Sequence, residues 1–182
     1  MKMNPEFVEL SSSTKMAWDE VHLLKSLPPH PKLVPFDCVV LEDVESRVIG
    51  FTMKYIPGGT LKDLKIPFRF EWIQQLTQLL DFLNIELGIM NQDIAPRNLL
   101  NDPDTGRVLL FDFDRAAHGK KCLMDGRDDV LGIVSTIYEI IANDIHFTSM
   151  PHWDRTMEMV QGLPSGLVIT NLTLTYRSFA AF

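Results

Sequence analysis

Apolar residues recur at helical spacing in two stretches of the chain. Between Phe70 and Leu87 they fall near positions i, i+3, i+4 and i+7, which predicts a helix with one face packed against a core. These residues are Trp72, Ile73, Leu76, Leu79, Leu80, Leu83 and Leu87. Residues 20–27 show the same spacing over a shorter stretch. Residues 168–176, in contrast, alternate between apolar and polar side chains, which is the pattern of a strand.

The segment Asn101–Gly106 predicts a tight turn between two apolar runs. Pro103 presets φ for a turn, and Gly106 permits a positive φ at its end. We therefore expect a hairpin that brings the polar residues before the first run close to those after the second.

Three oxygen-bearing side chains flank this hairpin. Asp93 and Asn98 precede it, and Asp112 follows it. Because Mg²⁺ prefers oxygen ligands and takes few protein carboxylates, we expect Asn98 and Asp112 to hold a metal ion. Asp93 would then be free to accept the proton of a hydroxyl acceptor. Such a set suits kinase-type phosphoryl transfer, which depends on positioned metal ions and an aligned acceptor oxygen.

The two segments around the hairpin resemble motifs of the protein-kinase-like superfamily. Residues 93–100 look like the kinase catalytic loop, and residues 112–114, Asp-Phe-Asp, look like its metal-binding Asp-Phe-Gly. The resemblance implies an α/β (α+β) fold of two lobes, with ATP and Mg²⁺ or Mn²⁺ as cofactors. It also implies transfer of the γ-phosphate of ATP to a hydroxyl group.

Residues 48–61 are similar to the fifth strand of that family and to the hinge that follows it. On this mapping Met53 is the gatekeeper next to the adenine. The Lys54 carbonyl and the Ile56 N–H would bind the adenine edge. An ordinary loop is the alternative interpretation of Gly58 and its neighbour.

Residues 20–35 resemble the C-helix and its exit into the fourth strand. Lys2 precedes Glu20 by a spacing similar to that between the family's third-strand Lys and C-helix Glu, so this pair would help to position the phosphates. A solvated Lys2 near the chain end is the alternative. Residues 128–141 resemble the buried helix of the large lobe, in which Asp129 would anchor the catalytic loop. A solvated helix cap is the competing role for that carboxylate.

The sequence also departs from the family. At 182 residues it is shorter than a complete kinase domain, and we expect a fold truncated at both ends. No glycine-rich loop precedes residue 20, and the segment after the Asp-Phe-Asp motif is short. Gln92 replaces the Arg that receives an activation-loop phosphate in many protein kinases, which argues against that form of regulation. The expected organisation is a residual small lobe, 1–57, and a partial large lobe, 58–182. The large lobe would contain the catalytic loop 91–100, the metal-binding motif 112–114 and an atypical tail at about 163–182.

Substitutions within the motifs leave the acceptor open. Ala95 replaces the Lys of Ser/Thr kinases, and Arg97 precedes Asn98 as in tyrosine kinases, so Arg97 could supply the missing cation. Asp-Phe-Asp followed by Arg115 also resembles aminoglycoside and choline phosphotransferases. Three interpretations remain: a kinase acting on protein, a kinase acting on a small hydroxylated molecule, and a catalytically weak pseudokinase or scaffold.

Composition narrows the partners and the cellular setting. The net charge is −7 and the pI about 5.1, without a basic stripe, which opposes nucleic-acid binding. No apolar run reaches the ~18 residues of a membrane span. The two cysteines and five histidines show no disulfide or metal-ligand pattern, and we interpret the histidines as structural. These features favour a cytoplasmic or nuclear setting.

Overall fold

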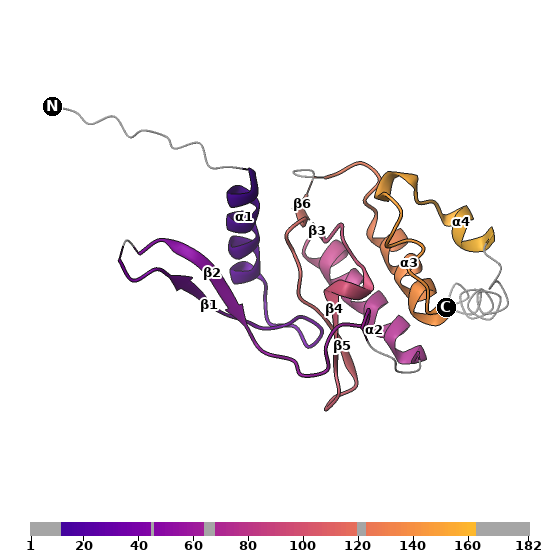
Figure 1. Cartoon of the computed structure of the whole chain (residues 1–182), viewed down its shortest axis with the longest axis horizontal. Helices are drawn as coiled ribbons and strands as arrows, with labels where there is room; N and C mark the ends of the chain where they lie inside the picture. Colours follow the sequence, from indigo (N-terminus) through magenta and orange to yellow (C-terminus); the bar gives the residue numbers. More distant parts are fainter. Residues whose placement is uncertain (1–11, 45, 64–67, 120–122, 163–182) are drawn as a thin grey trace.

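The computed structural model describes residues 12–44, 46–63, 68–119 and 123–162. Within these ranges the chain is a mixed α/β structure with four α-helices and three small antiparallel sheets of two strands each (Figure 1). Lys2 and the strand expected at 168–176 lie outside the described residues. No helix in the described part of the chain has the length and apolar character needed to cross a membrane.

Helix α1 (Ser12–Ser26) lies beside the hairpin of β1 (Phe36–Leu41) and β2 (Val48–Met53) (Figure 1). The helix is longer than the 20–27 stretch that the apolar spacing indicated. Phe36 pairs with Met53, and Leu41 with Val48, so the hairpin is antiparallel with irregular register between these pairs. Leu24 of α1 joins the main apolar core, which ties this part of the chain to the rest.

The helix predicted over residues 70–87 is present, but its final turns are wider than an α-helix. Helix α2 (Phe70–Leu80) continues as a π-helical segment, η1 (Asp81–Glu86). The Leu87 N–H donates to the Phe82 carbonyl at 3.1 Å, the i→i−5 bond of a π-helix. Trp72 and Leu83 are at most 1% exposed, as expected for the apolar face.

The predicted hairpin around Asn101–Gly106 is confirmed. Strands β4 (Leu99–Asp102) and β5 (Arg107–Leu110) are antiparallel, with Leu99 opposite Leu110. Gly106 has φ +67°, the left-handed conformation expected of it. The Asp102 carboxylate accepts the Thr105 hydroxyl at 2.7 Å, and this bond stabilises the turn.

A second strand pair keeps the two predicted motifs side by side. Strand β3 (Ile89–Met90) pairs with β6 (Ala117–His118), so the residues after β3 and those before β6 run close together. A short 3₁₀ turn, η2 (Pro96–Asn98), leads into β4. The candidate site lies between these segments.

Helix α3 (Asp129–Ala142) packs behind the residues that follow β3. A Cβ at Gly132 would lie 3.1 Å from Cβ of Ile94, so this glycine allows the close approach of helix and loop. Helix α4 (Met157–Gly162) packs through Val160 against Tyr138 of α3, and the short turn η3 (His152–Asp154) precedes it.

The residues after β2 add to the β4–β5 hairpin. The Leu61 N–H donates to the Leu99 carbonyl at 2.8 Å, and the Asn101 N–H donates to the Gly59 carbonyl at 3.0 Å. A Cβ at residue 58 would lie 1.8 Å from the Asn101 carbonyl oxygen. Gly58 is therefore required by packing and is not an ordinary loop glycine.

Candidate active site

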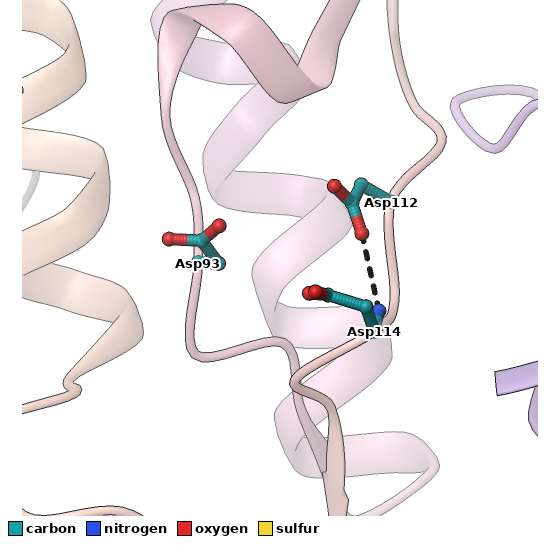
Figure 2. A group of neighbouring side chains, drawn as sticks. All are labelled: Asp93, Asp112 and Asp114. Atoms are coloured by element: carbon teal, nitrogen blue, oxygen red, sulfur yellow. Dashed lines mark hydrogen bonds between the residues drawn. The ribbon is translucent and has the colours of Figure 1, made fainter. Parts of the chain in front are cut away.

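Three carboxylates from the two predicted motifs converge. One ligand oxygen from each of Asp93, Asp112 and Asp114 lies within 4.8 Å of the others (Figure 2). The Asp114 N–H also donates to the Asp112 carboxylate at 3.1 Å, which holds this pair in a tight turn. Burial, followed by the charge of Asp112, raises the pKa of Asp114. A divalent cation would relieve this repulsion, and carboxylate oxygens are its preferred ligands.

Asp114 is a site residue that the sequence analysis missed. The resemblance to Asp-Phe-Gly assigns position 114 to the glycine of that motif, which is not a ligand. The sequence did contain a signal, because an acid two residues after Asp112 adds a hard oxygen at the same point in the chain.

Asn98 lies beside Asp93 and contacts it through its side-chain amide. Its Nδ2 donates to the Asp93 carbonyl at 2.9 Å and to the Asp93 carboxylate at 3.0 Å. The amide is 3% exposed. With Nδ2 engaged in this way, Oδ1 is the Asn98 atom that could ligate a metal ion.

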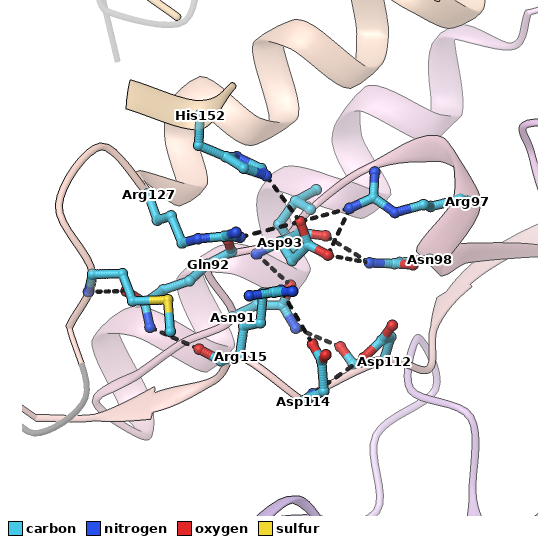
Figure 3. Close-up of polar contacts among 12 residues, drawn as sticks. Asn91, Gln92, Asp93, Arg97, Asn98, Asp112, Asp114, Arg115, Arg127 and His152 are labelled. Atoms are coloured by element: carbon cyan, nitrogen blue, oxygen red, sulfur yellow. Dashed lines mark hydrogen bonds and ion pairs between the residues drawn. The ribbon is translucent and has the colours of Figure 1, made fainter. Parts of the chain in front are cut away.

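Asp93 is not the free carboxylate that the sequence analysis expected. Arg97 Nη2 lies 2.7 Å from both of its oxygens, and Arg127 Nη1 and His152 Nε2 each lie 3.4 Å from Oδ1 (Figure 3). Burial acts to raise the pKa of Asp93, but the hydrogen bond and charge of Arg97, followed by Asn98 and Arg127, hold that pKa below its ordinary value. Asp93 is therefore ionised and surrounded by donors.

Asn91 and Asp129 fix the backbone on which Asp93 is placed. Asn91 Nδ2 donates to the Asp112 carbonyl at 2.7 Å, which connects the two motifs directly. The N–H groups of Asn91 and Gln92 donate to the two oxygens of Asp129 at 2.8 and 2.6 Å. Asp129 thus anchors this loop, and the helix cap is its neighbour Asp128, which accepts the Leu131 N–H at 2.7 Å.

Gln92 joins two later segments. Its Nε2 donates to the Arg115 carbonyl at 2.7 Å, and its Oε1 accepts the Met124 N–H at 2.6 Å. Its backbone has φ 64°, an uncommon conformation for a residue other than glycine. The Gln92 side chain therefore holds these neighbouring segments by neutral hydrogen bonds.

Glu20 reaches the site from α1. Its carboxylate accepts the Phe113 N–H at 3.1 Å. Burial raises the pKa of Glu20; the hydrogen bond from Phe113 opposes the shift, and the charges of Asp112 and Asp114 add to it. Because Lys2 lies outside the described residues, its pairing with Glu20 stays a prediction.

The predicted hinge residues lie at the end of β2 and directly after it. Met53 is half-buried and contacts the apolar core. The Lys54 N–H donates to the Pro35 carbonyl at 2.9 Å, and Ile56 is buried with Val34 and Leu109. The structure therefore places these three residues at the junction of the β1–β2 hairpin and the main core.

Three basic residues complete the surroundings of Asp93, and the sequence analysis missed them. Arg127, His152 and Arg155 come from segments far along the chain from residue 93, and no local spacing signals their approach. Figure 3 shows His152 and Arg127 on one side of Asp93 and the two acids of the 112–114 motif on another. The interpretation of His152 as merely structural overlooked its contact with Asp93.

We expect the environment of His152 to make stability depend on pH. Burial, followed by the charges of Arg155 and Arg127, lowers its pKa from 6.5 to about 4. Between these values the unfolded chain binds more protons than the folded chain, so the free energy of unfolding should fall as the pH falls from 6.5 to about 4. Urea unfolding at a series of pH values should show a flatter profile in this window for His152→Gln; identical profiles would refute the assignment.

Comparison with known proteins supports the family resemblance. No family model matches the sequence. Over 175 residues, 90% of this chain, the sequence is 25% identical to mitogen-activated protein kinase kinase kinase 3 of Mus musculus. It is 27% identical to the Homo sapiens protein of the same name over 134 residues, 69% of this chain. The matches include 27% and 21% of these relatives, so the chain spans about a quarter of their length. The chain is thus distantly similar to a protein kinase over most of its length, as the motifs indicated.

Proposed function

We propose that the chain is a protein-kinase-like phosphotransferase that binds ATP with Mg²⁺ or Mn²⁺ and transfers the γ-phosphate to a hydroxyl acceptor. The observation that carries the proposal is the convergence of Asp93, Asp112 and Asp114. Phosphoryl transfer needs metal ions on the β- and γ-phosphates and a carboxylate that orients the acceptor. The distant similarity to a protein kinase supports the same reaction class.

In this proposal the residues keep the roles that the motifs imply. Asp112 and Asn98 bind the metal, with Asp114 as a further oxygen ligand, and Asp93 orients the acceptor hydroxyl. Arg97 Nη2 lies 2.7 Å from the Asp93 carboxylate in the structure. In this proposal its side chain turns toward the transferred phosphate when nucleotide is bound. Glu20 fixes the metal-binding motif through the Phe113 N–H and, with Lys2, positions the phosphates.

The adenine would bind at the hinge next to Met53. No described residue donates a hydrogen bond to the Lys54 carbonyl, and none accepts one from the Ile56 N–H. These are the two backbone groups assigned to the adenine edge. We also propose that residues 1–57 and 58–182 correspond to the two lobes. The grouping of α1 with the β1–β2 hairpin, apart from α2, α3 and α4, supports this division (Figure 1).

A second candidate is a nucleotide-binding pseudokinase without turnover. The observation that favours it is the engagement of Asp93 by Arg97, Asn98 and Arg127, since a carboxylate held by these donors is a weak proton acceptor. A protein of this kind would bind Mg·ATP and show no transfer to any hydroxyl.

Calorimetry of Mg·ATP binding tests the site assignment. We expect Asp112→Asn to weaken metal-dependent nucleotide binding by at least about tenfold, because even the residues that support metal ligands typically contribute 10–100-fold to metal affinity. The matched control is Asp104→Asn, the same change in the exposed hairpin turn, which should leave binding unchanged. Equal affinities for the parent and Asp112→Asn would show that this carboxylate does not hold the metal.

A further inference from the structure

A pocket opens beside Asp93, on the other side from Asp112 and Asp114. Its walls come from the loop at residues 92–94, the start of α3 and the residues around η3. Its polar lining outside the loop comes from Arg127, Asp128, Ser135, His152 and Arg155. We call it the acceptor-side pocket, because a hydroxyl held by Asp93 would have the rest of its molecule here if the proposed function is correct.

The two arginines of the acceptor-side pocket have unused donors. Arg127 Nη1 donates to the Gln92 carbonyl at 2.9 Å and to the Asp93 carboxylate at 3.4 Å. Arg155 Nε and Nη2 both donate to the Met150 carbonyl, at 3.1 and 2.9 Å. The other guanidinium N–H groups of both side chains make no hydrogen bond to any described residue. Guanidinium groups that keep such N–H groups available are suited to oxyanions, which they bind through pairs of N–H groups.

Ser135 gives an independent indication of a ligand. The residue is 3% exposed and lines the pocket, yet its hydroxyl has no hydrogen-bond partner in the described part of the chain. Buried hydroxyl groups are normally paired. A ligand oxygen in the pocket would satisfy it.

The charges of the pocket favour an anion. Its two acids are already engaged, since Arg97 pairs with Asp93 and Asp128 caps α3. Arg127 and Arg155 together lower the pKa of His152 more than Asp93 raises it, burial being the largest cause of that shift. A polycationic acceptor such as an aminoglycoside would therefore meet repulsion.

We propose that the acceptor-side pocket binds an anionic group, a phosphate or a carboxylate, of the molecule whose hydroxyl is phosphorylated. This proposal rests on the proposed function and specifies its substrate class. The anionic group contacts Arg127, Arg155 and the Ser135 hydroxyl. The neighbouring hydroxyl is presented to Asp93, between the pocket and the metal-bound γ-phosphate.

Binding of inorganic phosphate, without nucleotide or metal, tests the pocket itself. Followed by NMR at constant pH, phosphate should shift the His152 ring resonances and leave those of His22 and His118 unchanged. Arg155→Gln should weaken this binding at least tenfold and Ser135→Ala a few-fold, while Arg47→Gln, an exposed arginine elsewhere, should not change it. If phosphate shifts the His152 resonances equally in the parent and in Arg155→Gln, phosphate is an adventitious ion only, and the proposal is overturned. A shift of the same resonances on addition of an aminoglycoside would also overturn it.

The Ser135→Ala variant keeps the test decisive if Arg155→Gln does not fold, because it removes one hydroxyl from a well-packed helix. Asp112→Asn should retain phosphate binding in the pocket. Failure of the nucleotide site is therefore distinguishable from failure of the pocket.

Acceptor preference tests the link to transfer. A serine peptide with a neighbouring phosphoserine should be phosphorylated with at least tenfold higher kcat/KM than the same peptide with alanine there. Glycerol 3-phosphate and glycerol form the corresponding small-molecule pair. The pair with the larger ratio of kcat/KM, anionic over neutral acceptor, shows whether the anionic group belongs to a peptide or to a small molecule. Arg155→Gln should abolish the preference through KM; no preference in either pair would contradict the proposal.

Discussion

Replacing Asp129 by alanine is expected to lower the free energy of unfolding by about 2–4 kcal/mol, a large part of the roughly 5–15 kcal/mol of a typical domain. Asp129 is 1% exposed and accepts the N–H groups of Asn91 and Gln92, which would be left without partners. Each unpaired buried donor costs about 1–3 kcal/mol. Burial also raises the pKa of Asp129, because the buried carboxylate is desolvated. Removal of the carboxylate relieves this desolvation and offsets part of the loss from the two unpaired donors.

Asp128→Ala is the matched control, the same substitution one residue earlier. Asp128 is exposed and caps α3 through the Leu131 N–H, so its loss should cost about 0.5–2 kcal/mol. Urea unfolding of the two variants gives the comparison. A larger loss in Asp128→Ala would mean that capping, and not anchoring of the loop, is the main role of this acidic pair.

Asp93→Asn is expected to reduce phosphoryl transfer by about 10²–10⁴-fold, the usual contribution of a positioned acid or base. The amide keeps the shape of the side chain and can still accept a bond from Arg97, but it cannot accept a proton. Binding of Mg·ATP should change little, because Asp112 and Asp114 remain. A sensitive transfer assay with the parent, Asp93→Asn and Asp104→Asn measures both parts of the expectation.

Two results would contradict this assignment. Unchanged transfer in Asp93→Asn would show a different base or a contaminating kinase. Absence of transfer in the parent, with Mg·ATP binding intact, would favour the pseudokinase.

Local sequence predicted much of the fold because the features concerned depend on near neighbours. The period of apolar residues marked α2, and Pro103 and Gly106 marked the β4–β5 turn. The π-helical turns at the end of α2 were not predictable, since a period of apolar positions does not distinguish i→i−4 from i→i−5 bonding.

The candidate site was predictable only in part, and the reason is distance along the chain. Asp93 and Asp112 are marked by motifs, and the structure brings them together across one hairpin. Arg127 and His152 approach Asp93 from elements whose packing no local pattern encodes. The sequence therefore indicated a carboxylate free for catalysis, whereas the structure shows one held by ion pairs.

Gly58 has a consequence for motion. Because its backbone lies directly against Asn101, and hydrogen bonds join residues 59–61 to β4, we expect the residues after β2 to move with the β4–β5 hairpin as one piece. A larger side chain at this position would separate them. Opening of the proposed nucleotide site would therefore occur on the N-terminal side of this piece, by a pivot of α1 and the β1–β2 hairpin. Such a pivot would break the Glu20–Phe113 bond while Asp93, Asp112 and Asp114 keep their mutual geometry.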